Sequence, residues 1–276
     1  MTTPRLPEPE SVPEPGGRSA RQVLTLVLIG VIGGLLSGAF GVGGGIVMVP
    51  LLILLAKLDQ RHASATSLVA IVPAAIAGTV SYALIGQVNV LVAVLIAAGG
   101  VVGSLIGARL LRTLSIRWLR WLFIALLLVV VVRLFLEVPQ RAGVIVLTPV
   151  SIPGLVVLGL AMGIASGLFG IGGGIVVIPV LVSLFGAGDL LAKGTSLLAI
   201  IPGAVTGTIA NARAGFVDVV DGAIVGVTAA LASFGGVALA SMLSPRLATI
   251  LFAVLLLAAT AQLMVRAIRD ERRLRG

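Results

Sequence analysis

The sequence contains no cysteine and only one histidine. Without cysteine, the chain cannot form disulfides, thiolate metal sites or a cysteine nucleophile. His62 alone cannot supply a multi-histidine metal site, and no Ser/His/Asp constellation accompanies it. We expect this imidazole to be solvated at a membrane interface, and we predict that the protein is not an enzyme and holds no metal and no cofactor.

Charged residues are also scarce, at 11% of the 276 residues against 59% hydrophobic ones. Soluble proteins carry about 25% charged residues. Most of the apolar runs approach the roughly 20 residues that a spanning helix needs, and they lack the alternation with polar residues that a membrane β-barrel requires. The sequence therefore predicts an all-α multi-pass membrane protein that is in contact with the lipid bilayer.

The formal net charge is +9, and the arginines lie mainly at the ends of apolar segments and in the C-terminal tail. This placement is typical of residues that set membrane topology and contact anionic lipid. A soluble nucleic-acid-binding domain would instead gather its basic residues on one polar face. We therefore predict no nucleic-acid partner.

One apolar unit occurs twice in the chain. Residues 37–86 reappear as residues 166–215 without insertion or deletion, and about half of the aligned positions are identical. The shared residues are mostly Gly, Pro, Ser and Thr, which interrupt helices or offer polar groups. Such a duplication is typical of transporters that bind substrate between two repeats.

The repeat divides the chain into a Pro-rich disordered cytoplasmic tail (1–21), a first transmembrane repeat (22–137), a linker (138–150), a second transmembrane repeat (151–269) and a basic cytoplasmic tail (270–276). Four arginines of the first copy surround the turn that follows its fourth apolar segment, and the second copy keeps only one of them. Arg109, Arg112, Arg117 and Arg120 align with Ala238, Ser241, Arg246 and Thr249. Because arginines favour the cytoplasmic side, we predict two inverted-topology repeats with about eight spanning helices and two short half-helices. Both termini are expected on the cytoplasmic side of the cell membrane.

Each copy contains a glycine-rich break, at 41–45 and 170–174, inside an apolar run. Glycine permits positive φ and leaves backbone N–H groups uncovered. A half-helix follows from Ile46 or Ile175, and its free N–H groups and positive dipole end can hold an anion without Lys or Arg. The predicted substrate-binding residues in the breaks are Gly43, Gly44, Gly45, Gly172, Gly173 and Gly174.

Polar side chains near the breaks extend the predicted site. Thr66 and Ser67 align with Thr195 and Ser196, and Tyr82 aligns with Asn211. Their polar groups could replace water around an oxyanion, or the hydroxyls could bond helix carbonyls, as is common in membranes. Helix breaks are expected at four prolines, namely Pro50, Pro179, Pro73 and Pro202.

Lys193 is aligned with Ser64 and so has no charged counterpart in the first copy. It could attract anions at one mouth of a pathway, but we expect its long side chain to reach the membrane interface instead. No Asp or Glu lies deep in an apolar segment, which argues against a proton relay through buried carboxylates.

Glycines also recur at four-residue spacing: Gly30, Gly34 and Gly38, their counterparts Gly159, Gly163 and Gly167, and Gly99, Gly103 and Gly107. Such small-residue faces let helices approach closely. We expect them to pack inside the bundle, and a homodimer formed through one of them is the alternative.

The motif that runs from Gly38 to Pro50 and again from Gly167 to Pro179, with Thr-Ser pairs before Pro73 and Pro202, resembles the TauE/SafE family. The resemblance covers nearly all of residues 22–268. It implies a multi-pass permease of the cytoplasmic membrane, with about eight spanning helices, that moves sulfite, sulfonates or other small sulfur-containing anions. We predict a secondary carrier for a small anion that alternates access between the two repeats. A passive anion channel and a non-transport membrane scaffold are the alternatives.

Overall fold

A computed structural model describes residues 18–136, 143, 145 and 151–275, and within these ranges it contains ten α-helices and no strand. The helices are α1 (Ala20–Phe40), α2 (Gly45–Leu54), α3 (Gln60–Leu84), α4 (Val90–Thr113), α5 (Ile116–Leu136), α6 (Ser151–Phe169), α7 (Gly174–Ser183), α8 (Asp189–Ala212), α9 (Val219–Met242) and α10 (Pro245–Arg275). The predicted all-α class is confirmed. Most of the predicted tail 1–21 and of the linker 138–150 lies outside the described residues.

Seven helices of the described part are long and apolar enough to cross a bilayer, namely α1, α3, α4, α6, α8, α9 and residues 249–269 of α10. The helices α2 and α7 contain 10 residues each. At about 1.5 Å per residue they reach only half-way through a hydrocarbon core of about 30 Å. The predicted pair of short half-helices is therefore confirmed.

Helices of the two repeats interlock. The helix α1 packs along α9, α4 packs along α6, and α3 and α8 contact both of these pairs. A methyl group on Gly34 would lie 2.2 Å from the carbonyl oxygen of Ala229, and one on Gly103 would lie 2.2 Å from that of Leu160. These clashes confirm the predicted packing of the glycine faces inside the bundle. A homodimer stays a prediction that would need another surface.

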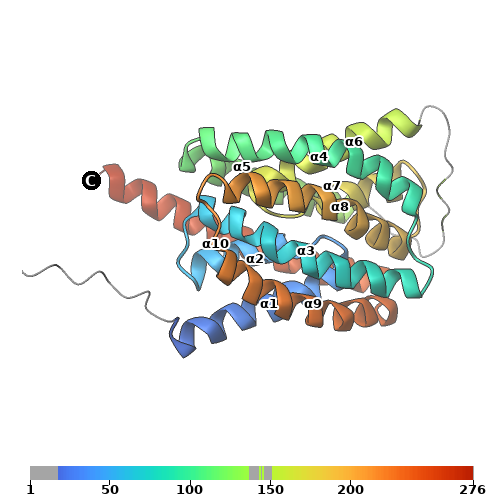
Figure 1. The fold of residues 1–276 in the computed structure, drawn as a ribbon, viewed down its shortest axis with the longest axis horizontal. Coiled ribbons are helices and arrows are strands. Elements are labelled where there is room, and N and C mark those ends of the chain that lie inside the picture. Colours follow the sequence, from blue (N-terminus) through green and yellow to red (C-terminus); the bar gives the residue numbers. More distant parts are fainter. Residues whose placement is uncertain (1–17, 137–142, 144, 146–150, 276) are drawn as a thin grey trace, which may run out of the picture.

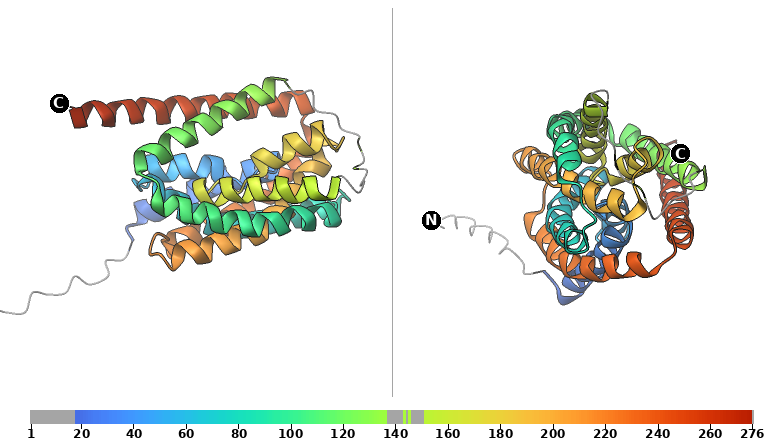
Figure 2. Two further views of the ribbon diagram at one scale, coloured as in Figure 1. Left: turned by 90° about the horizontal axis from the view of Figure 1, so that it is seen from above. Right: turned by 90° about the vertical axis from the view of Figure 1, so that its right-hand side faces the viewer.

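Figure 1 shows that corresponding helices of the two repeats run in opposite directions, with α1 and α3 running from left to right and α6 and α8 from right to left. The left view in Figure 2 agrees with this arrangement, and both of its views place α5 and α10 together on one flank. The helix α1 begins, and α10 finishes, at the same end of the bundle, here called the terminal face. The starts of α3 and α5 also lie at this face.

The four prolines correct one prediction. Helices α2, α3, α7 and α8 continue through Pro50, Pro73, Pro179 and Pro202 respectively, so the expected helix breaks at these residues are wrong. Each proline removes one backbone N–H, but packing against neighbouring helices holds the surrounding turns in helical geometry. The interruptions between α1 and α2 and between α6 and α7 lie at the glycine-rich segments and not at these prolines.

The helix α3 starts with a side-chain cap. Asp59 Oδ1 accepts hydrogen bonds from the backbone N–H groups of Arg61 and His62, at 2.8 and 3.1 Å. His62 Nδ1 lies 2.5 Å from Asp59 Oδ2, and the imidazole is 44% exposed. Partial burial alone would raise the pKa of Asp59, but the hydrogen bonds from His62 and Arg61 outweigh it and lower the pKa below its ordinary value.

Replacing Asp59 with alanine should destabilise the protein by about 1 kcal/mol at neutral pH, because α3 loses its cap. A carboxylate with a lowered folded-state pKa stabilises the fold above its unfolded pKa, near 4, and loses that contribution as the pH falls below it. Thermal unfolding of both proteins between pH 7 and pH 3, followed by tryptophan fluorescence, should therefore show a gap in melting temperature that closes in acid. An equal gap at every pH would contradict this account.

Candidate functional site

The two glycine breaks interrupt the chain in the interior of the bundle. The helix α1 ends at Phe40 and α2 begins at Gly45, with Gly41, Gly43 and Gly44 at φ values of 68, 81 and 76°. In the second repeat Gly170, Gly172 and Gly173 adopt 67, 82 and 84°. Positive φ in this range favours glycine strongly over other residues. The predicted breaks are thus present in both copies with nearly the same backbone geometry.

The two breaks meet each other. A methyl group on Gly45 would lie 2.1 Å from the carbonyl oxygen of Gly170, and one on Gly174 would lie 2.5 Å from that of Gly41. A methyl group on Gly43 would be 3.6 Å from the Cα of Gly172. All residues of both breaks are buried. The structure therefore brings together the six glycines that the sequence predicts for the substrate site.

Several backbone N–H groups of the breaks form no hydrogen bond among the described residues, although those of Gly41 and Gly170 donate to the carbonyl oxygens of Ser37 and Ser166. The N-cap residues of α2 and α7, Gly44 and Gly173, supply no side-chain cap. In the part of the chain that the structure describes, the N–H groups of residues 43–46 and 172–175 form no hydrogen bond. Buried N–H groups are rarely left unpaired in proteins, so these positions are suited to a ligand that accepts hydrogen bonds.

The serines of the predicted site hold the breaks in place. Ser67 Oγ donates to the carbonyl oxygen of Gly170 at 2.7 Å, and Ser196 Oγ donates to that of Gly41 at 2.6 Å. Each hydroxyl also lies near a carbonyl of its own helix, on Ser64 or Lys193. Each serine therefore binds the break of the opposite repeat through its single hydroxyl proton. We call these two hydrogen bonds the serine clamps.

The threonines face another pair of helices. Thr66 Oγ1 accepts a hydrogen bond from the backbone N–H of Asp218, just before α9, at 3.2 Å. Thr195 Oγ1 accepts one from the N–H of Asn89, just before α4, at 3.0 Å. These hydroxyls contact the loops that precede α9 and α4, whereas the neighbouring serines contact the glycine breaks.

Tyr82 and Asn211 occupy equivalent places but differ in their bonding. Tyr82 Oη donates to the carbonyl oxygen of Gly38 at 2.8 Å, one turn before the first break. Asn211 is fully buried, and neither atom of its amide has a hydrogen-bond partner among the described residues. The amide of Asn211 is thus a polar group of the second repeat that remains available to a ligand.

Two serines that sequence reasoning did not single out lie beside the breaks. Ser37 and Ser166 precede Gly41 and Gly170 by one turn, are buried, and have hydroxyls without a partner in the described part of the chain. Their identity in the two aligned copies was the signal that could have identified them. They add two potential hydrogen-bond donors near the glycines.

Lys193 corrects a second prediction, because it does not reach the membrane interface. Its side chain is 5% exposed, and its Nζ lies 2.8 Å from Asp189 Oδ2, one turn earlier in α8. The stem of the lysine lies against Gly41, where an added methyl group would be 2.6 Å from the lysine Cβ. A buried lysine must have its charge compensated, and Asp189 provides this compensation.

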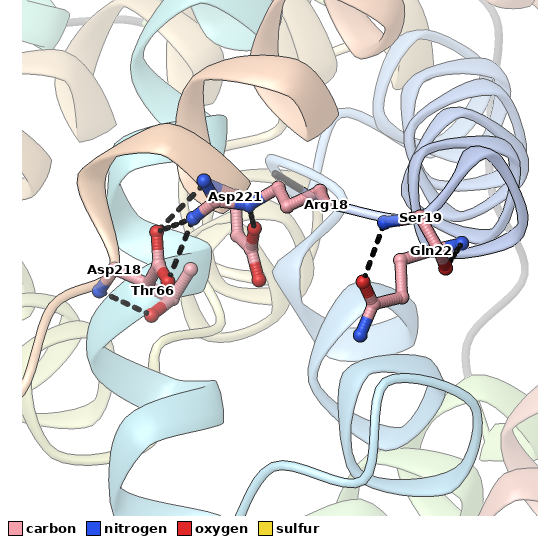
Figure 3. Close-up of polar contacts among 6 residues, drawn as sticks. All are labelled: Arg18, Ser19, Gln22, Thr66, Asp218 and Asp221. Carbon is pink, nitrogen blue, oxygen red and sulfur yellow. Dashed lines mark hydrogen bonds and ion pairs between the residues drawn. The ribbon is translucent and has the colours of Figure 1, made fainter. Parts of the chain in front are cut away.

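At the terminal face, an ion-pair cluster joins three helices (Figure 3). Arg18 Nη2 lies 2.8 Å from Asp218 Oδ1, and Arg18 Nε lies 2.5 Å from Asp221 Oδ1. Since Asp218 also bonds Thr66 through its backbone, the start of α1 is tied to α9 and to α3. The cluster is a contact of the bundle surface, because its charged groups remain partly exposed.

Comparisons with known proteins agree with this architecture. A family model described as "Sulfite exporter TauE/SafE" matches residues 3–134 and 155–275. The chain is 29% identical over 201 residues to YdhB of Bacillus subtilis (strain 168), and this alignment covers 71% of this chain and 82% of the relative. It is 27% identical over 216 residues to YunE of the same organism, covering 70% and 79%. A protein of Xylella fastidiosa (strain 9a5c) is 32% identical over 206 residues, covering 71% and 76%. All three relatives are named as probable membrane transporter proteins.

Proposed function

The chain belongs to the TauE/SafE family and is a membrane transporter, and we propose that it carries a small oxyanion past the two glycine breaks by alternating access. The anion is sulfite, an organosulfonate or a related sulfur-containing anion. The family description, which names a sulfite exporter, supports this class of substrate. The protein acts in the cytoplasmic membrane as a secondary carrier.

The observation that carries the proposal is the cluster of unpaired N–H groups where the two breaks meet. Residues 43–46 and 172–175 supply these groups at the starts of α2 and α7, in the buried centre of the bundle. Helix starts carry a partial positive charge and favour anions. Backbone donors at two facing helix starts therefore suit an oxyanion that sheds its water on entering the protein.

The reciprocal contacts of the two repeats support an inverted repeat, which is an arrangement common among transporters that work by alternating access. Each serine clamp, each threonine contact and each break has its counterpart in the other copy, and corresponding helices run in opposite directions (Figure 1). Rocking one repeat against the other would open the shared centre first to one side of the membrane and then to the other. Ile71 and Ile200, which flank Gly43, would close the centre between these states.

Uptake into liposomes tests the proposal. Purified protein should move at least one of sulfite, thiosulfate, sulfoacetate or taurine, with flux that saturates and with counterflow of labelled substrate. Substrate-free liposomes with and without pH and sodium gradients would reveal the coupling ion. Flux that does not saturate, together with single-channel currents, would identify a passive channel. The absence of flux for every anion tested would contradict transport and favour a membrane scaffold.

A further inference from the structure

Two positions at the start of α3 differ from their counterparts in the other repeat. Gln60 and Ser64 lie one turn apart on α3, and they align with Asp189 and Lys193 of α8. In the second repeat these side chains satisfy each other, because Lys193 Nζ lies 2.8 Å from Asp189 Oδ2. In the first repeat both side chains are neutral, so the ion pair of the second repeat has no counterpart there.

Gln60 and Ser64 are buried polar side chains that lack partners. Gln60 is 3% exposed, and Ser64 is fully buried. Neither the two amide atoms of Gln60 nor the hydroxyl of Ser64 forms a hydrogen bond within the described part of the chain. Such groups are costly to bury unless water or a ligand satisfies them. Their lack of partners therefore indicates that something else binds them during the working cycle.

These two side chains lie between the terminal face and the second glycine break. Gln60 borders a cavity of about 170 Å³ that lies between the end of α2 and the starts of α3 and α5. A methyl group on Gly170 would collide with the carbonyl oxygen of Ser64, so Ser64 adjoins the break. Only one turn of α3, about 6 Å, separates Gln60 from Ser64. The pair thus forms the step between the cavity and the break.

The charges of the cavity lining do not select an occupant. Lys57 and Asp59 carry opposite charges in this lining, and Arg120, which also lines the cavity, already interacts within the protein. Selection therefore falls to neutral hydrogen-bonding groups. The amide of Gln60 and the hydroxyl of Ser64 can both donate, as the N–H groups of the break do. A row of donors from the cavity to the break suits an oxyanion.

The opposite side of the bundle is closed by groups that satisfy one another. Tyr82 Oη donates to the carbonyl oxygen of Gly38 at 2.8 Å, and Tyr82 packs against Gly194, the neighbour of Lys193. Its counterpart Asn211, near the end of α8, is buried and has no partner among the described residues. Three aligned pairs therefore show the same contrast between a satisfied and an unpartnered side chain: Asp189 and Gln60, Lys193 and Ser64, Tyr82 and Asn211.

We propose that Gln60 and Ser64 form a hydrogen-bonding station for the transported oxyanion, between the terminal face and the second break. The inference rests on the proposed function and adds two substrate-binding residues to it. On its way from the terminal face, the anion exchanges water for the Gln60 N–H and the Ser64 O–H, and then for the N–H groups of residues 172–175. On the opposite side the ion pair of Asp189 and Lys193 fills the equivalent place, so the station exists on one side only.

Because the chain has no cysteine, Ser64→Cys would introduce a single thiol at the station. Full-length protein in phosphatidylcholine nanodiscs would be treated with a water-soluble methanethiosulfonate, and modification would be followed by mass spectrometry. Sodium sulfate or sulfoacetate should slow the modification severalfold relative to sodium chloride of equal ionic strength, because the bound oxyanion covers the thiol. Ala70→Cys, buried where α3 packs against Gly226 of α9, should stay unmodified. Arg21→Cys, exposed at the start of α1, should react equally fast in all three salts.

Gln60→Leu gives an independent readout. It replaces an unpartnered buried amide with an apolar side chain of similar size, so the melting temperature should stay the same or rise. Uptake into liposomes should nevertheless need about five- to tenfold more anion for half-saturation, because one hydrogen bond to the anion is lost. Ser81→Ala is the control on the same helix. Its hydroxyl bonds the carbonyl oxygen of Ala77, and its loss should leave half-saturation unchanged.

The station and the transport function fail separately. If Ser64→Cys is never modified, or if neither anion slows its modification, the station is wrong and water alone satisfies these groups. Wild-type half-saturation in Gln60→Leu would lead to the same conclusion. Anion flux by the wild type without protection of Ser64→Cys removes the station alone. Protection of Ser64→Cys by an oxyanion, in a protein whose wild type moves no anion in liposomes, removes the transport function and leaves the binding station.

Discussion

Replacing Gly43 with alanine is expected to reduce anion flux at least tenfold, or roughly 1.4 kcal/mol, while the protein still folds and inserts. The methyl group would lie 3.3 Å from Ile71 Cγ2 and 3.6 Å from the Cα of Gly172, in the space between the two breaks. It would cover N–H groups that the proposed anion needs. The φ of 81° also costs alanine about 1–2 kcal/mol.

Gly86→Ala is the matched control for this prediction. Gly86 has a φ of 70°, close to that of Gly43, but no atom lies within 4 Å of the position that its methyl group would take. The two variants therefore share the backbone strain and differ in the site. Uptake into liposomes and the melting temperature would be measured for both. Wild-type flux in Gly43→Ala, or an equal loss of flux in Gly86→Ala, would remove the breaks from the mechanism.

Replacing Lys193 with methionine is expected to destabilise the protein by about 3–5 kcal/mol, because the buried carboxylate of Asp189 loses its partner. The first repeat shows how the same place is filled without charge, since Gln60 and Ser64 stand at the positions of Asp189 and Lys193. The double variant Asp189→Gln/Lys193→Ser copies that pair into the second repeat. It should recover most of the lost stability.

Thermal unfolding of the wild type, Lys193→Met and the double variant would check this prediction. The order of melting temperatures should be wild type, then the double variant, then the single variant by a wide margin. A double variant as unstable as Lys193→Met would show that the ion pair does more than balance charge, and a harmless single variant would show that Asp189 is neutral in the fold.

The architecture was predictable because its signals are local. The duplicated glycines predicted both breaks, and the long apolar runs predicted an all-helical chain. Glycine spacing indicated tightly packed faces, but it could not name their partners. The pairing of α1 with α9 and of α4 with α6 joins segments roughly 200 and 60 positions apart, and only the three-dimensional fold reveals it.

The chemistry of the site was less predictable, because a hydroxyl that binds a carbonyl and one that binds a substrate look alike in a sequence. Ser67 and Ser196 proved to hold the opposite break, and the role of the site residues in binding an anion stays a prediction. The pairing of Asp189 with Lys193 was missed, although their spacing of four residues on a helix was a usable signal. The sequence also gave no sign of the cavity between the end of α2 and the starts of α3 and α5, because Lys57, Gln60 and Arg120 come together only in the folded chain.

The serine clamps have a consequence for the origin of the fold. Ser67 belongs to the first repeat and secures Gly170, and Ser196 belongs to the second and secures Gly41, so neither half holds both members of a clamp. A half-length ancestor could have satisfied its own carbonyl only by pairing with another molecule inserted in the reverse sense. Duplication and fusion would then have joined two such subunits into one polypeptide, after which the two halves could diverge.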